Sequence, residues 1–333
     1  MGAQPSTPFQ QAYRRFFERF AERRPIHANS LILTLFGDSV CPHGGEIWLG
    51  SLIRLVEPFG INQRLVRTSV FRLVEKGILQ SRQSGRRSYY SLTETGFRQF
   101  STAAQRIYHH HEQRWDGEWR LVFTQLNSLD ESLRERLRKE LQWLGFSRLA
   151  KGVYGHPTVS LEQVRLVTDE MGITDSVTLM RARIEDDDPV LSSVNLVRCC
   201  FQVEALKQAY AEFIELFEPM AAVLDRVGPE DEETCFLLRS LLIHEFRHLL
   251  LSEPDLPAEL FPADCLSHPA RDLVARIYLA IVEPAERHFR GMAESEQGAL
   301  PPADAQFALR FGGNAGISDT AVAAGSARSP APG

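Results

Sequence analysis

The first hydrophobic pattern in the chain is an aromatic stripe at helical spacing over residues 9–24, which Pro25 ends. Arginines occupy the opposite face, but Glu18 and Glu22 interrupt the basic charge. A targeting peptide would lack these acidic residues. We therefore expect residues 1–29 to form an amphipathic helix that packs against the next domain.

Three helices and a hairpin are predicted over residues 30–112. Ser30 is suited to cap the first helix, and apolar residues from Trp48 to Val56 predict the second. The third begins after Asn62, a good N-cap, and Gly77 ends it. Two short polar-apolar runs joined by a glycine turn follow and predict a β-hairpin. This order of elements is typical of a winged helix-turn-helix domain.

Charge points to the ligand of this domain. The chain has a net charge of −6, yet residues 61–90 hold seven basic residues and only Glu75 as an acidic one. Such a local reversal favours a polyanion, because neutralising phosphates releases condensed counterions. We predict that the third helix enters the major groove and that the hairpin contacts the DNA backbone or minor groove. The predicted DNA-binding residues are Gln63, Arg64, Arg67, Thr68, Arg72, Arg82, Arg86 and Arg87.

A strand-helix-strand-helix-strand rhythm follows over residues 113–185. Ser128 and Ser160 begin sequences typical of capping boxes, which support the two helices. If the middle strand region is split in two, the order becomes the βαββαβ arrangement of a ferredoxin-like domain. The fold class predicted for the whole chain is α+β and multidomain.

The last part of the chain is predicted to be helical and then disordered. An acidic linker at residues 185–189 closes the middle domain, and apolar stripes over residues 190–290 predict a helical domain. Residues 291–333 are rich in alanine, glycine, proline and serine. We expect this tail to be disordered.

One motif suggests chemistry of another kind. Residues 244–248 read HEFRH and match HExxH, in which two histidines bind zinc and the glutamate acts as general base. The downstream third-ligand pattern is missing, and no other catalytic motif occurs. We therefore predict no catalytic residue, no metal ligand and no enzyme activity, and keep a zinc metallohydrolase as an unlikely alternative.

The cysteine content and the apolar runs indicate where in the cell the protein is located. The five cysteines form no disulfide or zinc pattern, and no apolar run approaches the roughly 20 residues that a membrane helix needs. We expect a cytoplasmic protein with reduced thiols and no membrane partner.

Several segments together resemble the PaaX-type transcriptional repressors of phenylacetic acid catabolism. The resemblance covers about residues 30–289, and its motifs fall in all three predicted domains. They are FGDSV, EIWLGSLI, GINQRLVRTSVFRLVEKG, SGRRSYYSLTETG, WDGEWRLV and HEFRHLLLSEPDLPAELFPADC.

The resemblance implies a winged-helix domain, a Cas2-like middle domain and, over residues 190–290, a helical C-terminal domain for effector binding and dimerisation. It also implies a homodimer that represses an operon at a double-stranded DNA operator until phenylacetyl-CoA binds. No cofactor is expected beyond this effector. An acyl-CoA needs cationic groups beside an apolar pocket, so the candidate effector-binding residues are Trp143, Tyr210, Arg247 and His248. A related repressor that responds to another aromatic acyl-CoA or acid is the alternative.

Overall fold

The computed structural model describes residues 7–23, 26–109, 114–124, 129–262 and 264–313. The chain divides into two compact units, each described by itself. The first unit contains residues 1–110, 223–244 and 275–333, and the second contains residues 111–222 and 245–274.

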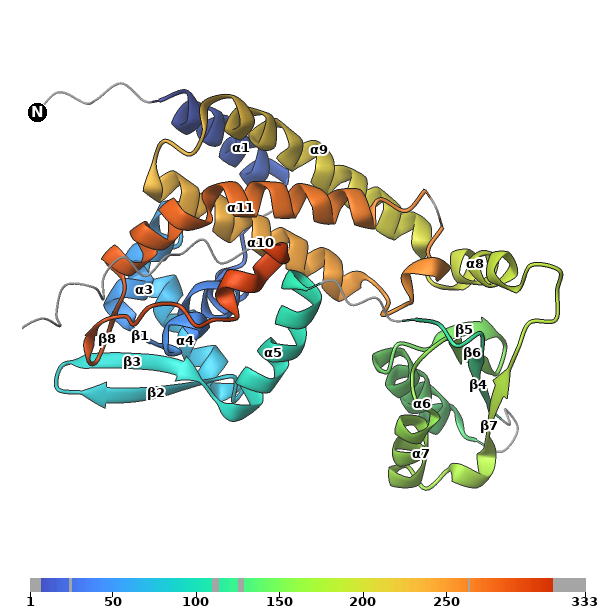
Figure 1. Cartoon of the computed structure of the whole chain (residues 1–333). Coiled ribbons are helices and arrows are strands. Elements are labelled where there is room, and N and C mark those ends of the chain that lie inside the picture. The colour runs from blue at the N-terminus through green and yellow to red at the C-terminus, as the bar shows by residue number, and fades with distance from the viewer. Residues whose placement is uncertain (1–6, 24–25, 110–113, 125–128, 263, 314–333) are drawn as a thin grey trace, which may run out of the picture. The chain divides into compact units, whose positions relative to one another are not determined.

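The first unit begins with helices and a small sheet (Figure 1). The elements are α1 (Pro8–Arg23), α2 (Ala28–Leu35), β1 (Glu46–Trp48), α3 (Leu49–Val56), α4 (Gln63–Glu75), β2 (Leu79–Ser84), β3 (Arg87–Leu92) and α5 (Glu94–Tyr108). The strands are antiparallel in the order β1-β3-β2. Three helices with this sheet form the winged helix-turn-helix arrangement that the PaaX resemblance implied.

Two details of this region differ from the sequence predictions. Ser30 lies inside α2, whose N-cap is His27 without a side-chain cap bond, so the predicted cap is wrong. Trp48 belongs to β1 and not to the second helix. A strand of three residues is too short to show an alternating pattern. The aromatic stripe of α1 is buried as expected, with Phe9 and Phe20 at most 1% exposed.

The middle domain, in the second unit, has the ferredoxin-like order of elements. These are β4 (Trp119–Thr124), α6 (Glu131–Trp143), β5 (Ser147–Ala150), β6 (Val153–His156), α7 (Leu161–Glu170) and β7 (Val177–Ala182). The sheet order is β5-β6-β4-β7, and all its pairs are antiparallel. Helices α6 and α7 cover one face, where Val122, Leu141 and Val164 form a shared core (Figure 1).

The predicted N-cap is confirmed for α7, whereas α6 is capped by a different residue from the one predicted. Ser160 accepts a hydrogen bond from Glu162 N at 3.2 Å and caps α7. Ser128 lies outside the described residues, and Asp130 is the observed cap of α6, accepting from Leu133 N at 2.8 Å.

The helices after the acidic linker do not form a unit of their own. They are α8 (Pro189–Cys200), α9 (Val203–Val227), α10 (Glu232–Ser252) and α11 (Ser267–Met292). Helices α9, α10 and α11 each contribute residues to both units. The helical character predicted for residues 190–290 is confirmed, and the bounds of a separate helical domain stay a prediction. Each long helix buries apolar residues in both halves, as Val274 and Phe289 of α11 show at 0% exposure.

The first part of the predicted disordered tail is ordered. Residues 294–299 form the hairpin β8 (Glu294–Ser295) and β9 (Gly298–Ala299), and a short helical segment, η6, spans Phe307–Gly312. Phe307 is 3% exposed and Arg310 is 7% exposed. The prediction is wrong for residues 291–313 because a few apolar residues and one arginine anchor a segment of low overall hydrophobicity. Residues 314–333 lie outside the described residues.

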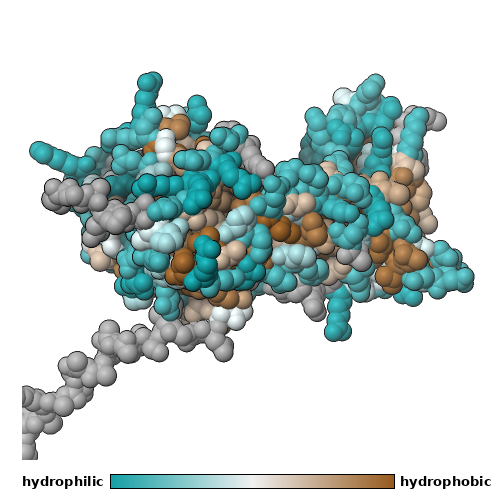
Figure 2. Space-filling model, turned by 90° about the horizontal axis from the view of Figure 1, so that it is seen from above, coloured by the Kyte–Doolittle hydropathy of each residue, from teal (hydrophilic) through white to brown (hydrophobic). Residues whose placement is uncertain are grey.

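On the face shown in Figure 2, hydrophilic residues predominate and hydrophobic ones form separate patches. Among the described residues, none of the helices combines the length and the apolar character that crossing a bilayer requires.

Candidate nucleic-acid interface

Helix α4 is held with one face inward and one outward. The Asn62 carboxamide oxygen accepts a hydrogen bond from Leu65 N at 2.9 Å and so caps the helix. Val66, Val70 and Leu73 are at most 2% exposed and pack toward α2 and α3. Because the cap and the buried stripe fix the rotation of the helix, the remaining side chains must face solvent.

The outward face carries all five of the helix residues predicted to bind DNA. Each of them is exposed: Gln63, Arg64, Arg67, Thr68 and Arg72. The Thr68 hydroxyl donates to the Arg64 carbonyl oxygen at 3.0 Å, and the Gln63 amide oxygen, turned toward Arg67, accepts from its Nη2 at 2.9 Å. The structure therefore places hydrogen-bonding groups suited to base edges on one accessible surface.

The wing is the β2–β3 hairpin. Ser84 is paired with Arg87, so Gly85 and Arg86 form the turn, and Gly85 adopts a left-handed φ of 57°. The sequence predicts that the turn carries both Arg86 and Arg87, but Arg87 is the first residue of β3 and lies outside the turn. The side chains of Arg82, Arg86 and Arg87 are all exposed.

Two of the wing arginines already have anionic partners. Arg82 donates from Nη2 to Glu46 Oε2 at 2.8 Å and also pairs with Glu296. Arg87 donates from Nη1 to Glu294 Oε2 at 2.8 Å. Glu294 and Glu296 come from the β8–β9 hairpin, whose strand β8 lies beside β1 (Figure 1).

An aromatic ring completes this surface cluster. The Arg87 guanidinium carbon lies 4.3 Å from the centre of the Trp48 ring, and that of Arg54 lies 5.2 Å from it. Arg54 is also 3.8 Å from Glu294. Three arginines therefore meet three glutamates here. Sequence reasoning missed these partners because Glu294 lies 207 positions from Arg87, which no local pattern connects.

Three family descriptions match the chain in order. The PaaX-like protein matches residues 27–96, the PaaX protein central Cas2-like domain matches residues 112–193, and the PaaX-like protein C-terminal domain matches residues 201–291. The chain belongs to the PaaX family. It is 35% identical over 303 residues to the Transcriptional repressor PaaX of Escherichia coli (strain K12), which covers 90% of this chain and 94% of that protein.

A solved structure is also similar to this PaaX-family chain. It is the uncharacterized protein Rv0674 from Mycobacterium tuberculosis, with 21% sequence identity and a TM-score of 0.45. The match covers 72% of this chain and 89% of that one. The matched PaaX domains end at residue 291, just before the hairpin that contacts the wing.

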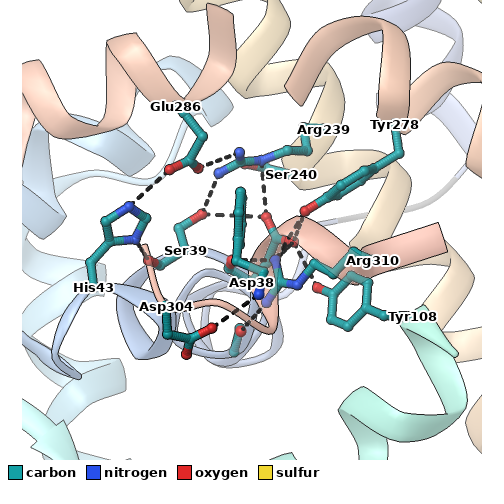
Figure 3. A network of polar contacts seen from close by, with 12 residues as sticks. Asp38, Ser39, His43, Tyr108, Arg239, Ser240, Tyr278, Glu286, Asp304 and Arg310 are labelled. Atoms are coloured by element: carbon teal, nitrogen blue, oxygen red, sulfur yellow. Dashed lines mark hydrogen bonds and ion pairs between the residues drawn. The ribbon is translucent and has the colours of Figure 1, made fainter. Parts of the chain in front are cut away.

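Behind the winged helix of this PaaX-family chain lies a buried network of charges (Figure 3). Asp38 is 1% exposed, and its carboxylate forms an ion pair with Arg239, whose Nε lies 3.0 Å away. The same carboxylate accepts hydrogen bonds from Arg310 Nη1 at 3.2 Å and from the Tyr108 hydroxyl at 2.6 Å. Arg239 also contacts Glu286 at 2.5 Å. Arg310 thus attaches the C-terminal segment to the N-terminal domain from inside.

The electrostatics of this network follow from its pairing. Burial alone would raise the pKa of Glu286, but the Arg239 guanidinium and the His43 ring lower it to about 2. His43 Nε2 lies 2.9 Å from Glu286 Oε2. Burial also raises the pKa of the Tyr108 hydroxyl well above its usual value. The Glu286 carboxylate therefore stays ionised opposite Arg239.

A cavity of about 130 Å³ borders the network in the first unit. Its lining includes Phe97, Phe100, Tyr108, Phe307 and Arg310. The four predicted effector residues do not line this cavity.

The predicted effector residues all belong to the second unit. Trp143 is 83% exposed at the end of α6, whereas Tyr210 is fully buried and donates its hydroxyl hydrogen bond to Glu253. Arg247 and His248 are partly exposed on α10. A role of these four residues in effector binding stays a prediction.

The HExxH motif lies on α10 with its first two residues inside the protein. His244 is 3% exposed and its Nδ1 lies 3.2 Å from the Thr34 hydroxyl oxygen, and Glu245 is 4% exposed. In the part of the chain that the structure describes, no three histidine, cysteine or acidic side chains come together as a metal site would require.

Proposed function

We propose that this protein is a DNA-binding transcriptional repressor of a phenylacetic acid catabolic operon, which phenylacetyl-CoA releases from its operator. The observation that carries the proposal is the exposed face of α4, where Arg64, Arg67 and Gln63 stand on a helix fixed by its cap and its core. Membership of the PaaX family, and a relative that is a transcriptional repressor, support it.

In this proposal α4 lies in the major groove. Arginine matches guanine O6 and N7 with its two-pronged guanidinium, and glutamine matches adenine in a similar way. Each good pair discriminates against a wrong base by about 1–3 kcal/mol. Arg64 and Arg67 then supply sequence preference, while Arg72 and the wing-tip Arg86 contact phosphates.

Release from DNA requires a second state of the protein. An effector shifts an equilibrium only by its difference in affinity for the two states. We propose that phenylacetyl-CoA favours a state in which the winged helices of a homodimer no longer match two half-sites of the operator. Another aromatic acyl-CoA or acid is the alternative effector.

The test is binding of the purified full chain to its own upstream promoter DNA at two salt concentrations, with and without phenylacetyl-CoA. Specific, salt-dependent binding that the thioester abolishes is the expected result. Specific binding that the thioester leaves unchanged would retain the repressor and remove this effector, and a panel of other aromatic thioesters and acids would follow. Binding equal to that of random DNA would overturn the repressor itself.

A matched pair of variants makes this test specific to α4. The R64A/R67A variant is expected to lose promoter binding. The control R165A removes an exposed arginine on α7, in the second unit, and is expected to bind like the wild type. Light scattering of the wild type tests the proposed homodimer.

A further inference from the structure

The β8–β9 hairpin is anchored to the winged helix through its backbone as well as its side chains. Glu294 N donates to the Ser51 hydroxyl at 3.1 Å, and Arg54 Nη2 donates to the Met292 carbonyl oxygen at 3.0 Å. Both contacts involve α3 or its side chains and not the wing. These bonds use backbone atoms of Met292, at the end of α11, and of Glu294. They do not involve the carboxylates of the hairpin, so glutamine substitutions at Glu294 and Glu296 preserve both bonds.

The carboxylates of the hairpin occupy the same groups that DNA would use. Glu294 accepts from Arg87, and Glu296 and Glu46 both pair with Arg82. A guanidinium binds carboxylate and phosphate with the same N–H groups and the same geometry. A phosphate must therefore displace a glutamate, or share the arginine with it, to contact the wing at these two positions.

The exposure of these pairs indicates that they can exchange. The side chains of Arg82 and Arg87 are 53% and 49% exposed, and those of Glu294 and Glu296 are 40% and 34% exposed. Exposed ion pairs contribute little to stability and are screened by salt. Structural need alone does not explain why a segment after α11 places two carboxylates on two wing arginines.

We propose that the β8–β9 hairpin is an acidic clamp, defined by Glu294 and Glu296, which competes with DNA phosphates for Arg82 and Arg87. The clamp lowers the affinity of the wing for all DNA sequences and leaves discrimination between sequences to α4. This inference rests on the proposed function, in that it assumes that the wing meets DNA.

The experiment measures binding of the full chain to promoter DNA and to a random duplex of equal length over a series of salt concentrations. The E294Q/E296Q variant is expected to bind both duplexes about three- to tenfold more tightly at low salt. Each arginine released to phosphate is expected to steepen the slope of log K against log salt by about 0.9. Equal gains on both duplexes would match a contact to phosphates.

The control is E135Q/E162Q, which removes the same charge from two exposed glutamates that pair with arginines on α6 and α7. It is expected to change affinity little. If this control gains as much as the clamp variant, net charge explains the effect and the clamp is wrong. Unchanged or weaker binding by E294Q/E296Q overturns the clamp too, since weaker binding would mean that the glutamates position the arginines for DNA.

A second test adds the E294Q/E296Q substitutions to a protein that already lacks the two wing arginines. In an R82A/R87A protein, adding E294Q/E296Q is expected to leave DNA affinity unchanged, because the two arginines for which the clamp competes with DNA are absent. A gain that persists there overturns the clamp. Failure of the proposed function would give a different result from failure of the clamp. In that case the wild type would bind promoter and random DNA with the same affinity, and so would R64A/R67A.

Discussion

Two sets of ion pairs link the N-terminal domain to later parts of the chain, and they use the same chemistry in opposite surroundings. At the wing, Arg82 and Arg87 meet glutamates with about half of each arginine side chain exposed. In the interior, Arg239 and Arg310 meet Asp38 with 0% and 8% of their side chains exposed. Water reaches the first set and is excluded from the second.

This difference changes what each set can do. An exposed pair contributes about 0–1 kcal/mol, because solvent competes for both charges. Removing one partner of a buried pair costs about 3–5 kcal/mol, because the other charge stays buried without compensation. Exposed pairs are suited to exchange with a ligand, and buried ones to holding a segment in place.

The largest expected effect is at Asp38. Replacing it with asparagine leaves Arg239 and Arg310 without their common anion, and we expect a loss of about 3–5 kcal/mol in the free energy of unfolding. Urea denaturation followed by circular dichroism measures this loss. The exposed control E162Q is expected to lose less than about 1 kcal/mol. A similar small loss in D38N would remove the distinction between the two sets.

Acid is expected to weaken the second unit through His156. Burial, with Arg120 nearby, lowers the pKa of its ring from 6.5 to about 4. His156 Nδ1 accepts from Thr158 N at 3.1 Å and Val159 N at 3.0 Å, so the folded state needs the unprotonated nitrogen. As the pH decreases from 6.5 to 4, the unfolded chain binds a proton at this histidine and the folded chain does not. The free energy of unfolding is therefore expected to decrease by about 3 kcal/mol over this range.

The measurement is the free energy of unfolding from pH 7.5 to 4 for the wild type and for H156N. The asparagine oxygen can accept the two backbone hydrogen bonds but does not titrate. The variant is expected to lose less stability than the wild type over this range. Parallel curves would show that His156 does not carry the effect.

On α4, Arg64→Ala and Arg67→Ala are each expected to weaken promoter binding by about 1–3 kcal/mol and to reduce the preference over random DNA. Competition binding with both duplexes measures the two quantities. R165A serves again as the control. If promoter and random DNA weaken equally, these arginines contact phosphates and not bases.

The smallest effect compares two arginines of the wing. Arg86→Ala is expected to make the salt slope less steep by about 0.9 and to weaken all sequences alike. Arg82→Ala is expected to change the slope less, because Glu46 and Glu296 already compensate that charge. Equal changes would argue against the pairing described for the wing.

Local signals in the sequence predicted the elements of the interface well. Asn62 caps α4 as its residue type suggested, and the stripe of α4 is buried as its spacing required. These features depend on neighbours within one or two helical turns. For the same reason the exposed side chains of α4 could be predicted one by one.

Contacts distant in sequence could not be predicted in this way. Arg310 lies in a segment whose composition suggests disorder, but it is held by Asp38, which is 272 positions away. No local pattern shows this pairing. The strand β1 is three residues long, and its pairing with β3 becomes visible only in the sheet. The glutamates of the acidic clamp carry no local signal of a partner at all.

The burial of Arg310 beside Asp38 also has a consequence for synthesis on the ribosome. The two residues are separated by 272 positions, which at about 5–20 residues per second corresponds to roughly 15–55 s of translation. Until Arg310 emerges, the interior of the DNA-binding domain contains an aspartate that lacks one of its two arginines. We expect ribosome-arrested chains ending at residue 290 to be cut by protease within this domain faster than full-length chains released from the ribosome. Equal rates of cleavage would show that the domain matures earlier.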